Sequence, residues 1–183
     1  MNETRLVLEG TIDRTFAEDV LHRIGHDVPD DCEHLHVTLQ SPGGSVPIAL
    51  AVAELLLSLP CRVTTLNPGR VDSAALLVFA AGDTRLCTPD AGFLAHPVGR
   101  HMTGLQTRAS LMAQLRGIEE DTRRTIAFLA QQTRPSAAST WRRLMARQTV
   151  VGAERALRLG LVHAVVESTE ERMGASDDVA ENA

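Results

Sequence analysis

The chain has 183 residues, of which 44% are hydrophobic, 3% aromatic and 22% charged, and its formal net charge is -5. This length allows one domain with a sizeable core. The negative charge and the lack of a basic cluster argue against nucleic acid or an anionic membrane as a partner. All 18 basic residues are arginine, which excludes Schiff-base lysines, P-loop lysines and serine proteases that use lysine as the base.

No segment predicts membrane insertion or export. The longest apolar stretches, 48–57 and 74–81, are much shorter than the roughly 20 residues that a membrane span needs. No charged-then-apolar signal peptide opens the chain. Cys32, Cys61 and Cys87 are odd in number and lack a CxxC pair, which is typical of free thiols in a reducing compartment. We therefore expect a cytoplasmic protein.

Hydrophobic periodicity alternates between two and about 3.6 residues over the first half of the chain. It predicts strands over 5–10, 35–39, 62–66, 84–87 and 92–95, and helices over 15–25, 47–59 and 73–81. Gly25 is expected to end the first helix. This alternation of strands and helices, with right-handed crossovers, predicts an α/β domain with a largely parallel sheet.

The second half is dominated by a proline-free segment, 105–132, with recurring apolar residues. As a helix it would span roughly 42 Å, about the diameter expected for the whole domain, so part of it should project. A projecting helix with an apolar stripe is more typical of an oligomer contact than of a free arm. Helices over 138–147 and 153–159 and a strand over 161–166 complete a domain of residues 1–166. The acidic segment 167–183 is expected to be a disordered tail.

Polar and glycine residues follow three of the predicted strands. Ser73 lies at the start of a helix, where unpaired N–H groups and the helix dipole favour a developing negative charge, although a plain helix cap is the alternative. Gly43 and Gly44 would let backbone N–H groups approach a ligand closely. His96 could supply the base that a serine nucleophile requires, or it could be a structural histidine at a strand end.

His34 and His36 lie two apart on a predicted strand and therefore share a face, and an HxH pair can bind metal. Because no third ligand is evident in the sequence, we expect both histidines to face solvent. We expect no resident metal and no cofactor.

These motifs, in this order, resemble the proteolytic subunit of the Clp protease. The segments that carry the resemblance, which extends over 5–166, are SPGGSV at 41–46, GRVDSAALLVFAAGD at 69–83, FLAHPVG at 93–99, the long helix, and ERALRLGLVHAVV at 154–166. The resemblance implies an α/β ClpP/crotonase-like fold of stacked β-α-β units with a protruding handle helix. It also implies heptameric rings, stacked through the handle into a closed chamber, that cleave a polypeptide substrate.

Carried over by residue, the resemblance implies a serine-type endopeptidase. Ser73 would be the nucleophile and His96 the general base, and the N–H groups of Gly44 and Ala74 would form the oxyanion hole. The segment 97–104 matches the place where family members bind a substrate peptide as an added strand.

The sequence departs from the family pattern at three places. An ungapped alignment back from Gly160 puts Leu144 where the family has the triad aspartate, and no carboxylate lies between Arg134 and Ala153. Asp72 and Ala75 replace the small residue and the glycine usual around the serine. Only residues 1–4 precede the first strand, where the family has an axial hairpin that meets an ATP-driven unfoldase, so a Clp-type ATPase partner is not supported by the sequence.

Two other functions remain open. The replacement at Leu144 is compatible with a catalytically impaired Clp-fold subunit that has a structural or regulatory role. A crotonase-like acyl-thioester enzyme would share the fold and the oxyanion geometry alone.

Overall fold

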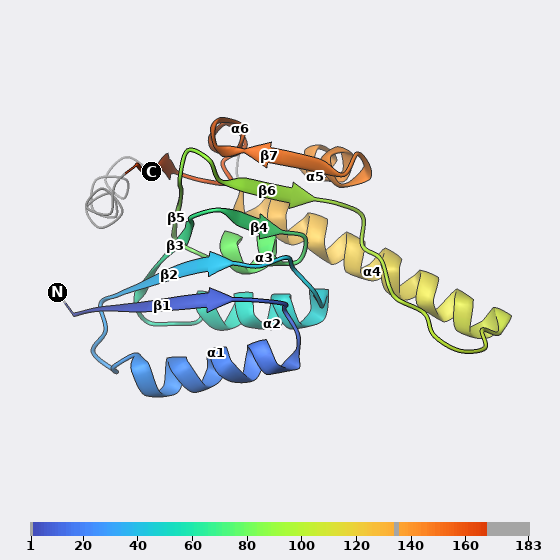
Figure 1. Cartoon of the computed structure of the whole chain (residues 1–183), viewed down its shortest axis with the longest axis horizontal. Helices are drawn as coiled ribbons and strands as arrows, with labels where there is room; N and C mark the ends of the chain where they lie inside the picture. The colour runs from blue at the N-terminus through green and yellow to red at the C-terminus, as the bar shows by residue number, and fades with distance from the viewer. Residues whose placement is uncertain (1, 134–135, 168–183) are drawn as a thin grey trace.

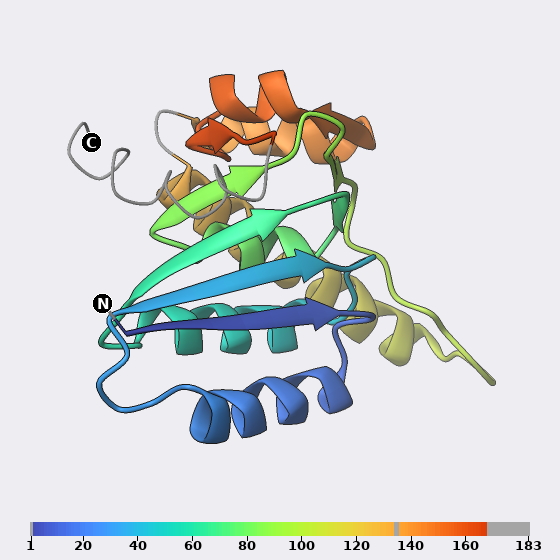
Figure 2. The same ribbon diagram turned by 60° about the vertical axis from the view of Figure 1, so that its left-hand side comes forward.

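Five parallel strands form the main sheet, in the order β1-β2-β3-β5-β8, in a computed structural model that describes residues 2–133 and 136–167. These strands are β1 (Glu3–Glu9), β2 (His34–Gln40), β3 (Arg62–Asn67), β5 (Thr84–Cys87) and β8 (Ala164–Val165). Leu35, Val37 and Leu39 alternate along β2 and are fully buried, because successive side chains of a strand point to opposite faces. The buried face of the sheet is covered by helices α1 (Arg14–Asp27) and α2 (Val46–Leu57), which lie side by side beneath it (Figures 1 and 2).

A second, smaller sheet lies beside the first and carries the candidate site. It comprises β4 (Arg70–Asp72), β6 (Gly92–Ala95) and β7 (Thr149–Gly152), in the order β4-β6-β7. β4 and β6 are parallel. β6 and β7 are antiparallel, with register pairs from Gly92 opposite Gly152 to Ala95 opposite Thr149. The short helix α3 (Ala75–Ala80), all of whose residues are buried, follows β4 directly.

The long helix α4 (Arg108–Gln132) extends away from the body of the molecule (Figure 1). Its buried residues all lie between Asp121 and Leu129, whereas Leu111, Met112 and Leu115 in its first half are exposed. The helix begins at Arg108 because Thr107 and Ser110 form a reciprocal capping box. The predicted projecting helix is therefore confirmed, with a start three residues later than expected.

Helices α5 (Ala138–Ala146) and α6 (Ala153–Arg158) pack against the small sheet and close the fold.

The predicted α/β class with a mainly parallel sheet is confirmed. Gly25 does not end the first helix, which continues to Asp27. The short strands β4 and β7 were not predicted. The expected disordered tail, 167–183, lies outside the described residues except for Glu167. The three cysteines form no disulfide, and none of the described helices is long and apolar enough to cross a membrane.

Candidate active site

Ser73 occupies the turn that connects β4 to α3. Its backbone is in the left-handed region, with φ of 58°, and its N–H donates to the carbonyl oxygen of Leu94 on β6 at 2.7 Å. A non-glycine residue in this region costs roughly 1–2 kcal/mol, and such strain is found at functional turns more often than elsewhere. The N-cap position of α3 is Ala74 and has no side-chain cap hydrogen bond, so Ser73 is not a helix cap.

The glycine turn before α2 packs directly against Ser73. Gly43 has φ of 90°, and a Cβ atom built on it would lie 2.6 Å from both the Asp72 carbonyl oxygen and the Ser73 Cβ. Gly44 has φ of 152° and leaves no room for a side chain beside Ile12. Glycine is therefore required at both positions, by backbone conformation and by close approach.

The two expected oxyanion-hole donors lie on these two adjacent turns. A Cβ on Gly43 would lie 3.0 Å from the Ala74 nitrogen, which shows how closely the glycine turn approaches the turn after Ser73. Across the residues that the structure describes, neither the Gly44 N–H nor the Ala74 N–H donates an intramolecular hydrogen bond. Both groups are thus available to an oxyanion.

His96 immediately follows β6 and is half-buried. Its Nδ1 lies 2.8 Å from the carbonyl oxygen of Pro97. Because a carbonyl only accepts, this contact requires the tautomer with a proton on Nδ1, which leaves Nε2 as a proton acceptor. No hydrogen bond joins His96 to Ser73 within the described part of the chain.

Ser73 and His96 nevertheless line one small cleft. The remaining lining residues are mainly apolar and come from α2, α3, β6, α4 and α5 and from the segment after His96: Val46, Ala74, Leu76, Ala95, Val98, Thr125, Leu129 and Met145. Thr125 is 4% exposed, and its hydroxyl has no hydrogen-bond partner among the described residues. The cleft therefore offers one polar group in an apolar wall, in addition to Ser73 and His96.

No carboxylate reaches His96 in the described structure. Leu144 is 1% exposed and belongs to the core cluster. Asp72 accepts from the Leu94 N–H and pairs with Arg70, and the buried Asp121 pairs with Arg100 at 2.7 Å. Both aspartates are therefore held in structural contacts, in agreement with leaving them outside the predicted site.

The strand pairing brings the residue that precedes β7 to the end of β6, from which His96 follows. The register of β6 and β7 ends with Ala95 opposite Thr149. His96 directly follows this last pair on one side, and Gln148 directly precedes it on the other. Gln148 has φ of 47°, and it and Ser73 are the two non-glycine residues of the described chain with positive φ. The ungapped alignment back from Gly160 could not single out Gln148, because the position of Gln148 depends on β7, a strand that was not predicted.

The expectation about the HxH histidines is wrong. His34 is 6% exposed and the His36 side chain is 11% exposed, so neither faces solvent. Together with Glu3 they form a cluster at the amino-terminal ends of β1 and β2. This cluster is remote in the topology from Ser73, which follows the carboxyl end of β4.

Comparison with known proteins agrees with this architecture. The Clp protease family model matches residues 1–169. The ATP-dependent Clp protease proteolytic subunit 1 of Tropheryma whipplei (strain Twist) is 26% identical, over 94% of this chain and 84% of its own length. The corresponding subunit 1 of Corynebacterium diphtheriae is 29% identical, over 89% of this chain and 79% of its own. A putative ATP-dependent Clp protease proteolytic subunit-like protein of Streptomyces coelicolor is also 29% identical, over 90% and 79%.

A solved structure shows the same fold. A mutant of ClpP1 from Listeria monocytogenes superposes with a TM-score of 0.79 at 16% identity, over 91% of this chain and 93% of that one. The fold is thus that of a ClpP subunit, as the resemblance implied. The chain belongs to the Clp protease family, and its low identity to these relatives makes it a divergent member.

Proposed function

We propose that this protein is a serine endopeptidase of the Clp proteolytic-subunit type that acts through a dyad of Ser73 and His96. The observation that carries the proposal is the cleft shared by these two side chains, beside two N–H groups with no intramolecular acceptor. Membership of the Clp protease family supports the same chemistry.

In the proposed mechanism, Ser73 Oγ attacks the peptide carbonyl carbon while His96 Nε2 takes the hydroxyl proton. The Gly44 and Ala74 N–H groups donate to the resulting oxyanion. His96 then returns the proton to the leaving amine as the C–N bond breaks, which leaves an acyl-serine. Water, deprotonated by the same nitrogen, hydrolyses that ester and restores the hydroxyl.

Catalysis should be slow because the His96 ring is oriented by a neutral carbonyl. The Pro97 carbonyl fixes the tautomer through Nδ1, but it stabilises the imidazolium less than an ionised carboxylate would. In the serine-protease template, neutralising the triad aspartate lowers turnover about 10⁴-fold, or roughly 5.5 kcal/mol of barrier. That no carboxylate among the described residues contacts His96 also favours the second candidate function, a catalytically impaired subunit.

The cleft favours substrates with an apolar side chain next to the scissile bond. Leu76, Leu129 and Met145 contribute to its wall, and burying a charged side chain there would leave it unpaired. Assembly into stacked rings through α4 is part of the proposal. The exposed leucines and methionine of its first half form an apolar surface that a second copy could cover.

Covalent labelling with a fluorophosphonate tests the proposal, with the modified peptide identified by mass spectrometry. We expect labelling at Ser73, loss of labelling in Ser73→Ala, and no change in Ser139→Ala, whose serine is exposed on α5. Cleavage of apolar reporter peptides should follow the same pattern.

The alternatives give different results. No labelling in a folded, assembled protein would contradict the peptidase and support the impaired subunit. Stabilisation by acyl-CoA thioesters, in the absence of labelling, would instead indicate the crotonase-like activity.

A further inference from the structure

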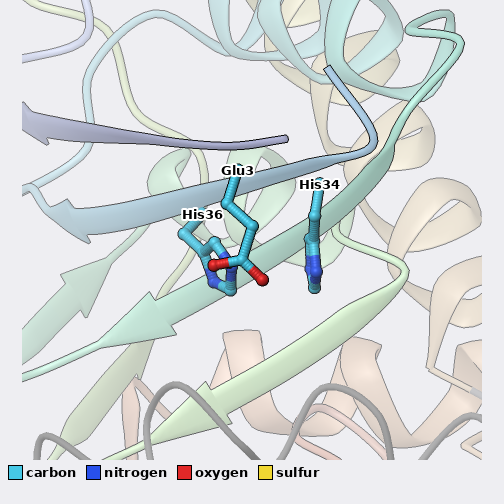
Figure 3. A group of neighbouring side chains, drawn as sticks. All are labelled: Glu3, His34 and His36. Carbon is cyan, nitrogen blue, oxygen red and sulfur yellow. The ribbon is translucent and has the colours of Figure 1, made fainter. Parts of the chain in front are cut away.

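Three metal-ligating side chains from two strands meet at the amino-terminal end of the main sheet. The parallel register pairs Glu3 of β1 with His34 of β2, and His36 lies two residues further along on the same face. Figure 3 shows the three side chains leaving their strands on one side, with the Glu3 carboxylate directed toward the two imidazoles. One ligand atom of each residue lies within 4.8 Å of those of the other two.

The two imidazoles are held in place by the surrounding sheet. Their rings stack with centroids 4.1 Å apart and an interplanar angle of 28°. His34 Nε2 lies 2.7 Å from Thr64 Oγ1 on β3, and His36 Nε2 lies 3.6 Å from Glu3 Oε2. A hydroxyl that fixes the plane of a histidine ring is the kind of partner that orients metal ligands.

We infer that Glu3, His34 and His36 form a site for a divalent cation of the zinc class. Two imidazole nitrogens and one carboxylate oxygen match the donors that Zn²⁺ takes, with the remaining position left for water. Mg²⁺ and Ca²⁺ prefer sites made of oxygen atoms alone and suit this donor set less well. The alternative is a purely structural histidine pair beside a carboxylate, which would not bind Zn²⁺.

The charges facing the cluster determine which ligand matters most. Arg5 and Arg62 are the register partners of His36 and His34 on the neighbouring strands. Within the described residues neither arginine forms an ion pair with Glu3. Their positive charge weakens the binding of any cation, so the Glu3 carboxylate is the group whose neutralisation should reduce affinity most.

Such an ion would join β1 to β2 at the start of the sheet. The three ligands come together only when the chain is folded. Bound metal would therefore stabilise the native state. The site lies at the opposite end of the strands from the Ser73 cleft, so this inference does not depend on the proposed peptidase activity.

Titration of the chelator-treated protein with ZnCl₂, followed by calorimetry and thermal unfolding, tests the inference. We expect one Zn²⁺ per chain and a Tm increase of about 5 °C or more at saturation. MgCl₂ should give no shift. Glu3→Gln should lower Zn²⁺ affinity at least tenfold, whereas Glu9→Gln, at the other end of β1, should not change it.

A second histidine pair requires its own control. His22 and His26 on α1 lie with ring centroids 4.2 Å apart, so His26→Gln should leave Zn²⁺ binding unchanged. Substituting Co²⁺ should give no thiolate charge-transfer absorption, because the site contains no cysteine. The inference is overturned if Zn²⁺ does not bind, if Glu3→Gln binds as tightly as wild type while its metal-free Tm is unchanged, or if His26→Gln abolishes binding.

Discussion

Replacing the buried Arg85 with methionine should destabilise the protein by about 3 kcal/mol. Arg85 is 6% exposed, and its guanidinium connects three parts of the chain. It donates to the carbonyl oxygens of Gly82, Gln132, Gly160 and Leu161 at 2.9–3.1 Å. Gln132 is the last residue of α4, so this one side chain holds the base of the projecting helix against β5 and the turn after α6.

The magnitude follows from opposing contributions. Each carbonyl left without a donor in the interior costs roughly 1–3 kcal/mol, so the four carbonyls together give a gross loss of about 4–12 kcal/mol, which is larger than the expected net effect. Against this, the variant no longer buries a cation, and burial is what lowers the pKa of Arg85 to about 10. Breaking buried charged contacts typically costs about 3–5 kcal/mol, and we expect the lower end because methionine keeps the apolar packing.

Thermal unfolding of Arg85→Met at matched protomer concentration should show a Tm lower by about 6–12 °C. The matched control is Arg14→Met, because Arg14 is an exposed residue of α1 whose ion pair is with the exposed Glu18. Its stability should remain within about 0.5 kcal/mol of wild type. A Tm for Arg85→Met within 2 °C of wild type would refute the reasoning, since it would mean that the carbonyls do not depend on the guanidinium.

Three further predictions concern the site and its surroundings. Gln148→Asp should raise kcat/KM for peptides about 10²-fold, and at most about 10⁴-fold, because it would place a carboxylate beside the last β6–β7 pair, which His96 follows. An unchanged rate with intact folding would contradict a position within reach of His96. Gly43→Ala should destabilise by about 2 kcal/mol or more and abolish labelling of Ser73, because its Cβ would collide with that residue; normal labelling would refute this. Burial and then the Arg85 charge lower the pKa of His163 to about 4, so the unfolded chain binds a proton that the native state does not between about pH 6.5 and 4. Stability should therefore fall as the pH decreases through this window, by roughly 1–2 kcal/mol after allowance for the partly exposed ring. Urea titrations should show this loss of stability in the wild type and not in His163→Asn.

The order of helices and strands could be predicted because periodicity is a local property of the chain. The strands over 84–87 and 92–95 were predicted with their observed bounds. β4, of three residues, is too short to show a period, and β7 (Thr149–Gly152) lies in the short gap between two predicted helices, so their pairing with β6 was not anticipated. The start of α4 was misplaced because the capping box at Thr107 and Ser110 uses a serine in place of the usual glutamate or glutamine.

The site was predictable only as a set of residue types. Ser73, His96 and the glycine pair each follow a strand, and parallel strands bring their carboxyl ends to one edge. Two features were not accessible in this way. The Pro97 contact of His96 depends on a ring orientation, and the position of Gln148 depends on an antiparallel register.

The sequence by itself determined the α/β class, the projecting helix, the family resemblance and the candidate nucleophile, because these depend on local patterning and on the order of short motifs. Tertiary structure alone decided which distant residues meet. The Glu3 carboxylate became a neighbour of His34 and His36 through a register between strands about 30 residues apart in the chain. Ser73, in its left-handed backbone conformation, donates a hydrogen bond to Leu94 of β6. Both outcomes depend on long-range pairing, which a local pattern does not specify.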